Sequence, residues 1–171
     1  MNVFIFSKKG DQGITSLLTG ERISKASLRP NAYGTLDEAS SALGLAKTFT
    51  LNEAILEMIQ AVQEDLLILG ARLSDTAADS EYSIGTERIQ RLEEWIVKIQ
   101  EEVPIPRHFI YPGVNSVSAS IDLARSIIRR AERVATALKE AGEIDSAEVH
   151  SYLNRLADFL FILARYAEKR G

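Results

Sequence analysis

Five long amphipathic stripes fill nearly all of the chain after residue 29, each repeating apolar residues at alternating spacings of three and four. This spacing places the apolar side chains on one face of an α-helix, so each stripe predicts one helix with a buried face. The expected helices begin near Pro30, Asn52, Thr86 (as a cap), Val117 and Val149. Five such helices joined by short loops predict an all-α fold, an antiparallel five-helix bundle of the ferritin-like up-down type.

No internal repeat or low-complexity linker divides the 171 residues, and this length suffices for one sizeable core. We therefore expect a single domain, residues 1–171, in which an irregular segment (1–29) precedes the bundle (30–171). The sequence contains no E-x-x-H motif, which argues against the di-iron chemistry found in some bundles of this type.

The composition excludes several classes of function. The chain has no cysteine, so disulfides, thiolate metal sites and thiol nucleophiles are absent, and its two histidines are far apart. No apolar run reaches membrane-spanning length, and the first residues lack the apolar core of a signal peptide. A net charge of −4 argues against general nucleic-acid binding. We expect a cytoplasmic protein that binds neither membranes nor nucleic acid.

The first twenty-nine residues show no helical period and carry five basic residues against two acidic ones. The run 7–17 combines two lysines, two glycines and several hydroxyl groups with one carboxylate, Asp11. Glycines let backbone amides converge on an anion, lysine adds positive charge, and a carboxylate can hold Mg²⁺. The segment thus has the chemistry to grip a polyphosphate, although its spacing is not that of a Walker motif. A mobile basic tail is the alternative.

A second basic group lies on the expected fourth helix, where Arg125, Arg129 and Arg133 stand four residues apart with Arg130 beside them. Like charges at this spacing repel unless an anion lies against them, although a solvated face compensated by Glu132 is the alternative. The chain offers few side chains for nucleophilic or acid–base catalysis. A basic cradle of this kind suits a reaction whose nucleophile arrives with a cofactor.

Five segments, in order along the chain, resemble the signature of the PduO-type ATP:cob(I)alamin (corrinoid) adenosyltransferases. They are residues 7–16 with Gly20, Arg22 and Lys25; residues 32–38; residues 109–113; residues 124–133; and residues 152–158. The resemblance implies an enzyme that moves the 5′-deoxyadenosyl group of ATP onto the cobalt of cob(I)alamin and releases tripolyphosphate. Cobalt is then the nucleophile, which agrees with the lack of one in the protein.

The resemblance also implies roles for individual residues. The ATP phosphates, with Mg²⁺, are assigned to Ser7, Lys8, Lys9, Gly10, Asp11, Thr15, Ser16 and Lys25, and the rest of the nucleotide site to Arg129, Arg130, Arg133 and Asn154. Catalysis is expected to depend on Arg129, Arg125 and Asp37, with Arg125 paired to Asp37 of a neighbouring subunit in a homotrimer. Phe109 is expected to displace the lower axial ligand of the corrinoid. A corrinoid reductase is a further expected partner.

The chain departs from the family pattern at Ser7 (usually threonine), Val114 (often glycine), Asp122 (often histidine) and residues 28–31, which replace a more acidic approach to the first helix. Val114 and Asp122 adjoin the expected corrinoid side, so the corrinoid accepted stays open. Two other functions stay open as well. One is a non-catalytic ATP-binding bundle that senses nucleotide or carries a corrinoid, and the other is a structural bundle without a ligand.

Overall fold

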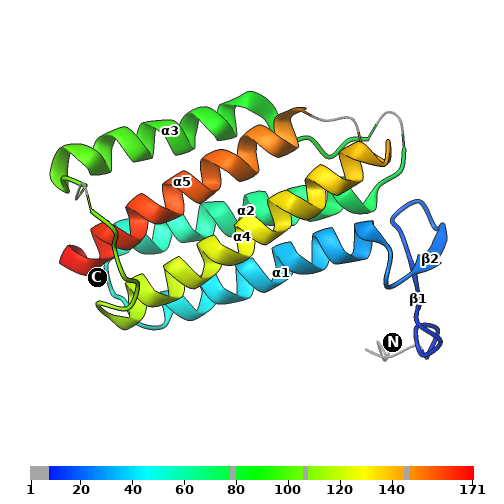
Figure 1. Ribbon diagram of the computed structural model, residues 1–171, viewed down its shortest axis with the longest axis horizontal. Helices are drawn as coiled ribbons and strands as arrows, with labels where there is room; N and C mark the ends of the chain where they lie inside the picture. The colour runs from blue at the N-terminus through cyan, green and yellow to red at the C-terminus, as the bar shows by residue number, and fades with distance from the viewer. Residues whose placement is uncertain (1–7, 78–79, 106–107, 145–146) are drawn as a thin grey trace, which may run out of the picture.

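The computed structural model describes residues 8–77, 80–105, 108–144 and 147–171, in which five helices follow a small hairpin (Figure 1). The helices are α1 (Leu28–Lys47), α2 (Glu53–Ser74), α3 (Gly85–Glu102), α4 (Ser116–Glu140) and α5 (Ala147–Arg170). The prediction of an all-α five-helix bundle is confirmed.

Side-chain caps explain where two of the helices begin. Asn52 accepts the Ile55 amide at 3.2 Å at the start of α2, as its position before the stripe suggested. Asn115 and Ser118 form a reciprocal capping box at the start of α4. The expected cap at Thr86 is wrong, because Thr86 lies inside α3. There the Ser83 hydroxyl accepts the Gly85 amide at 3.4 Å, so a different hydroxyl serves the first turn.

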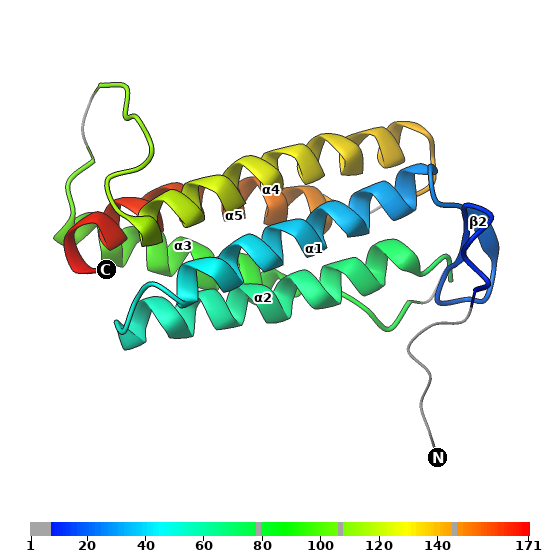
Figure 2. The ribbon, with the colours of Figure 1, turned by 90° about the horizontal axis from the view of Figure 1, so that it is seen from below.

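The bundle is built around α1, α4 and α5. Helix α1 packs against both α2 and α4, α4 also packs against α5, and α3 lies on the outer side of α5 (Figures 1 and 2). Tyr152 and Phe159 on α5 are the largest fully buried side chains, and the ring of Phe159 meets that of Trp95 on α3. None of the helices in the described part of the chain is both long and apolar enough to cross a membrane.

The N-terminal segment contains an element that the sequence did not reveal. Strands β1 (Ile14–Ser16) and β2 (Arg22–Ser24) pair antiparallel, with Thr15 opposite Ile23. Strands of three residues are too short to show a recognisable alternation. A two-stranded hairpin is marginally stable by itself, so its position depends on contacts with the bundle.

The hairpin and the loop between α3 and α4 lie at opposite ends of the bundle (Figures 1 and 2). Helix α4 alone has 25 residues, which corresponds to about 37 Å along its axis. This separation determines which of the predicted site residues one chain can bring together.

Candidate functional site

The loop before β1, residues 8–13, consists of two successive tight turns. The Asp11 amide donates to the Lys8 carbonyl and the Gly13 amide to the Gly10 carbonyl, each at 3.2 Å. Lys8 has φ 56°, in the left-handed region that residues other than glycine rarely occupy. Backbone strain of this kind is often found at ligand-binding segments.

The ammonium group of Lys25 lies against this loop. A Cβ atom at Gly10 would come within 3.0 Å of Lys25 Nζ, so the missing side chain at Gly10 makes room for the charge. The Lys25 amide donates to the Gly13 carbonyl at 2.8 Å, and Arg22 Nη2 donates to the Lys9 carbonyl at 2.8 Å. The structure therefore brings Lys8, Lys9, Gly10 and Lys25 together, as expected for a polyphosphate site.

Three other residues assigned to the phosphates lie nearby. Thr15 and Ser16 belong to β1, where the Ser16 hydroxyl accepts Arg22 Nη1 at 3.1 Å. The carboxylate of Asp11 is exposed and forms no ion pair with any described residue, which leaves its oxygens available to a cation such as Mg²⁺. Ser7 lies outside the described residues.

The arginine group on α4 is only partly compensated. Arg130 forms an ion pair with Glu38 on α1, and Arg133 Nη1 donates to the Arg129 carbonyl at 2.9 Å. Arg129 itself is exposed and has no ion-pair partner in the described part of the chain. Its guanidinium is thus available to an anionic ligand.

Asn154 on α5 lies beside this arginine group. Its Nδ2 atom donates to Glu132 Oε1 on α4 at 3.2 Å, which places the amide on the same side of the bundle as the predicted nucleotide site. Asp158, one turn later on α5, pairs instead with Arg155 of the same helix at 3.0 Å.

Asp37 and Arg125 do not meet within one chain. Asp37 lines a mostly apolar groove of about 350 Å³ between α1 and α2, beside Tyr33 and Leu66. Arg125 stacks on the ring of Phe161, 5.5 Å from its centroid, and its Nε atom is buried without a hydrogen-bond partner. Neither residue forms an ion pair with any residue that the structure describes.

Phe109 stands on the loop before α4 and is 93% exposed. On the same loop, Ile110 and Pro112 line a cavity of about 300 Å³, which Arg125 and Phe161 also line. An exposed apolar ring beside a partly apolar cavity fits contact with a large ligand rather than a role in the core.

The structure shows what the aspartate at position 122 does, where the family pattern often has histidine. Its carboxylate accepts Arg165 Nη2 at 2.5 Å, and Arg165, which is 3% exposed, also pairs with Glu168 at 2.8 Å. The guanidinium of Arg165 lies 5.3 Å from the Phe161 ring, on which Arg125 also stacks. Asp122 therefore neutralises a buried cation in the wall of the cavity. In the sequence, Arg165 appears as a charge within the apolar stripe of the last helix.

A second buried ionic group was missed at the sequence level. Asp65 on α2 is fully buried, pairs with Arg88 and Arg91 on α3, and accepts the Tyr152 hydroxyl at 2.7 Å. Burial, together with the negative charge of Asp65, raises the pKa of Tyr152 well above its ordinary value. Asp65 interrupts the apolar stripe of α2, which is the signal that a buried partner exists.

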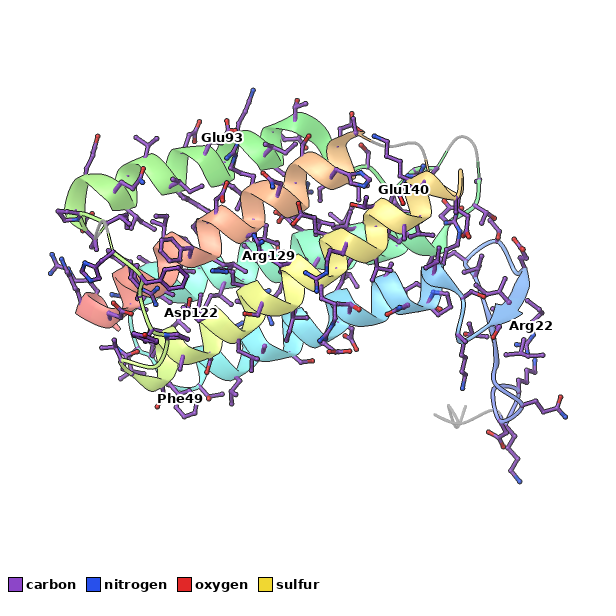
Figure 3. The ribbon with its side chains drawn as sticks, viewed as in Figure 1. Arg22, Phe49, Glu93, Asp122, Arg129 and Glu140 are labelled. Carbon is purple, nitrogen blue, oxygen red and sulfur yellow. The ribbon has the colours of Figure 1, made fainter. Side chains whose placement is uncertain are left out.

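The predicted site residues are thus distributed along the whole bundle. Figure 3 shows Arg22 on the hairpin beyond one end, Arg129 near the middle of α4, and Asp122 closer to the opposite end. The N-terminal loop, the arginine group and Phe109 are separate regions of a single chain.

Comparison with known proteins identifies the class to which this arrangement belongs. The cobalamin adenosyltransferase family profile matches residues 5–167. The corrinoid adenosyltransferase of Mycobacterium leprae is 40% identical over 172 aligned residues, covering 95% of this chain and 90% of that protein. That of Citrobacter freundii is 36% identical and covers 96% and 94%, respectively.

Among solved structures, a variant PduO-type ATP:corrinoid adenosyltransferase from Lactobacillus reuteri, complexed with cobalamin and ATP, superposes with a TM-score of 0.89. It is 30% identical, and the match covers 96% of this chain and 91% of that one. The chain belongs to the cobalamin adenosyltransferase family.

Proposed function

We propose that this protein transfers the 5′-deoxyadenosyl group of ATP to the cobalt of cob(I)alamin, giving adenosylcobalamin and tripolyphosphate. The cobalt electron pair forms the Co–C5′ bond while the C5′–O bond breaks, and its electrons leave with the tripolyphosphate. Cobalt rises formally from Co(I) to Co(III). The observation that carries the proposal is the cationic N-terminal loop, in which the Lys25 ammonium packs on Gly10.

The protein's own part is to bind, orient and neutralise charge. Lys8, Lys9, Lys25 and the loop amides hold the triphosphate, the hydroxyls of Ser7, Thr15 and Ser16 donate to it, and Asp11 helps to hold the accompanying Mg²⁺. Arg129, Arg130, Arg133 and Asn154 complete the nucleotide site. Donors placed where charge develops on the leaving group lower the barrier, since no protein nucleophile takes part.

Arg130 must exchange one partner for another in this scheme. Its guanidinium is held by Glu38 when no nucleotide is bound, and both side chains are about half exposed, so the ion pair is weak. A triphosphate carries more charge than one carboxylate and displaces it.

We place the corrinoid at the loop that carries Phe109. An apolar ring that occupies the lower face of the corrinoid removes the axial ligand there and leaves four-coordinate Co(II), which is easier to reduce. A corrinoid reductase supplies the electron, because cob(I)alamin forms only by reduction of cob(II)alamin. With ATP as co-substrate, we assign the reaction to the cytoplasm.

We further propose that the working unit is a homotrimer with its sites between subunits. Asp37 and Arg125 form no ion pair with a described residue of the same chain and lie on different parts of the bundle, as expected for a head-to-tail contact that closes into a ring. The same contact would bring the N-terminal loop of one subunit close to Phe109 of its neighbour, so that regions of two subunits form one site.

The test is an anaerobic assay in which the protein, chemically reduced cob(I)alamin, ATP and Mg²⁺ are mixed and the visible spectrum is followed. We expect conversion to adenosylcobalamin that requires ATP, and a loss of about 10²-fold or more in the Arg129→Ala variant, since one charged donor to the leaving group is removed. Circular dichroism of the variant should match the wild type, because Arg129 is exposed.

Wild-type turnover in Arg129→Ala would disprove the role of that residue. If ATP raised the melting temperature but no adenosylcobalamin formed, the protein would be a nucleotide-binding module and not an enzyme. At a hundredfold excess of ATP over its dissociation constant, that stabilisation is about 2.7 kcal/mol.

A further inference from the structure

Arg29, the second residue of α1, is buried although it precedes the apolar stripe of that helix. Its side chain joins segments that are far apart in the sequence. Nη1 donates to the carbonyls of Leu73 at 2.8 Å and Asp75 at 3.3 Å, where α2 ends. Nη2 donates to the Glu143 carbonyl after α4, and Nε pairs with the Glu143 carboxylate at 3.3 Å. Only a guanidinium, whose donors point in several directions from one plane, can satisfy these acceptors together.

The hairpin is attached to the same stretch of chain. The Leu18 amide donates to the Ser74 carbonyl at 3.0 Å, and the hydroxyls of Thr19 and Thr76 are 2.9 Å apart. Asp75 stiffens this stretch, since its Oδ1 accepts the Ala77 amide at 2.9 Å. We call residues 74–77 the mount.

The N-terminal loop, residues 8–13, leads directly into strand β1 of the hairpin. Leu17 closes the hairpin through its amide, which donates to the Glu21 carbonyl at 2.9 Å, and Arg22 and Lys25 bind the loop by the hydrogen bonds described above. Leu17 is buried, yet it does not belong to the main apolar core. The hydrogen bonds to the mount therefore contribute to the hairpin's attachment.

We propose that Arg29 is a positioning residue for the nucleotide: by holding the mount against α1 and the segment after α4, it fixes where the N-terminal loop stands relative to the bundle. The inference rests on the proposed function in one respect, that this loop binds the ATP phosphates. Arg29 touches no reacting atom, and its effect passes through the mount and the hairpin.

The experiment compares Arg29→Gln and Thr76→Val with the wild type by hydrogen exchange and by steady-state kinetics. Arg29→Gln removes the guanidinium, and Thr76→Val removes only an exposed hydroxyl contact. Arg91→Gln is the matched control, because it weakens a buried ion pair far from the hairpin. Local opening of the hairpin sets exchange of the Leu18 amide, so general loss of stability in the control should leave that rate unchanged.

For Arg29→Gln we expect Leu18 exchange to accelerate about tenfold, as for the loss of one hydrogen bond to a charged group. The KM for ATP should rise by about the same factor, while kcat and the KM for cob(I)alamin stay within about twofold. Thr76→Val should raise both the Leu18 exchange rate and the KM for ATP by about threefold. If Arg29→Gln does not fold, Arg29→Lys, which keeps the charge but loses the forked donors, takes its place with the same expected directions.

Unchanged Leu18 exchange in a folded variant would overturn the proposal, as would faster exchange with an unchanged KM for ATP. An absence of adenosyl transfer in the wild type would instead disprove the proposed function. In that case the exchange rates, with ATP affinity from calorimetry, still test the mount.

Discussion

Single charged residues within apolar stripes are the most informative positions of this chain. Asp65 and Arg165 each face the core, and each has an ion-pair partner on another helix. An unpaired buried charge costs several kcal/mol, so such an interruption implies a partner. The identity of that partner does not follow from the sequence, because Asp122 and Arg165 are 43 residues apart and meet only through the packing of α4 on α5.

The pair between Asp122 and Arg165 should contribute measurably to stability. Asp122→Asn leaves a buried guanidinium with only Glu168 as its counter-charge, and we expect a loss of about 2–3 kcal/mol in the free energy of unfolding by denaturant titration. Asp158→Asn breaks an exposed pair and serves as the control, with an expected loss below about 1 kcal/mol. Equal losses in the two variants would contradict the importance of burial at this position.

At the scale of elements, the periodicity of apolar residues was sufficient to predict all five helices and the start of α2 at Asn52. It could not predict the hairpin, because the hydrogen bonds that locate it join Leu18 and Thr19 to the end of α2, more than fifty residues away. Nor could it show how α3 is attached, since Arg88 and Arg91 lie on its polar side and reach across to Asp65.

The attachment of α3 should give stability a distinctive dependence on pH. The folded protein keeps the Tyr152 proton at pH values where the unfolded chain, with an ordinary pKa of 10.0, has lost it. The stabilising contribution is thus complete below about pH 10 and is lost as the pH rises further.

Tyr152→Phe removes this titration together with the hydrogen bond to Asp65. At neutral pH the variant should be less stable by about 1–2 kcal/mol. Between about pH 9 and pH 11 the variant should lose less stability than the wild type. Only in the wild type does unfolding release the Tyr152 proton over this range. Denaturant titrations across this range test the difference, with Tyr111→Phe, whose ring is exposed, as the control. Parallel pH curves for wild type and Tyr152→Phe would contradict the assignment.

At the scale of the whole molecule, the residues of the predicted site have charges available for a ligand but lie in separate regions of the bundle. The motifs predicted candidate site residues, and the structure groups the N-terminal loop with Lys25 and the arginine group with Asn154. Sequence spacing gives no distance between these groups. The helices set that separation, which is the reason for the proposal that regions of two subunits form one site.

A charge exchange between Asp37 and Arg125 tests this requirement. Asp37→Arg and Arg125→Asp each place two like charges at every proposed subunit contact, and a closed ring repeats that repulsion three times. Each single variant should therefore sediment as a monomer and lose adenosyl transfer while keeping its helical content.

The double variant restores an opposite pair at every contact and should recover the trimer. Because Arg155 lies on an exposed face and pairs with Glu93 of its own chain, Arg155→Asp controls for the change in net charge. Single variants that remain trimeric would show that Asp37 and Arg125 do not form the subunit contact. A wild type that is monomeric and active would show that one chain holds both substrates.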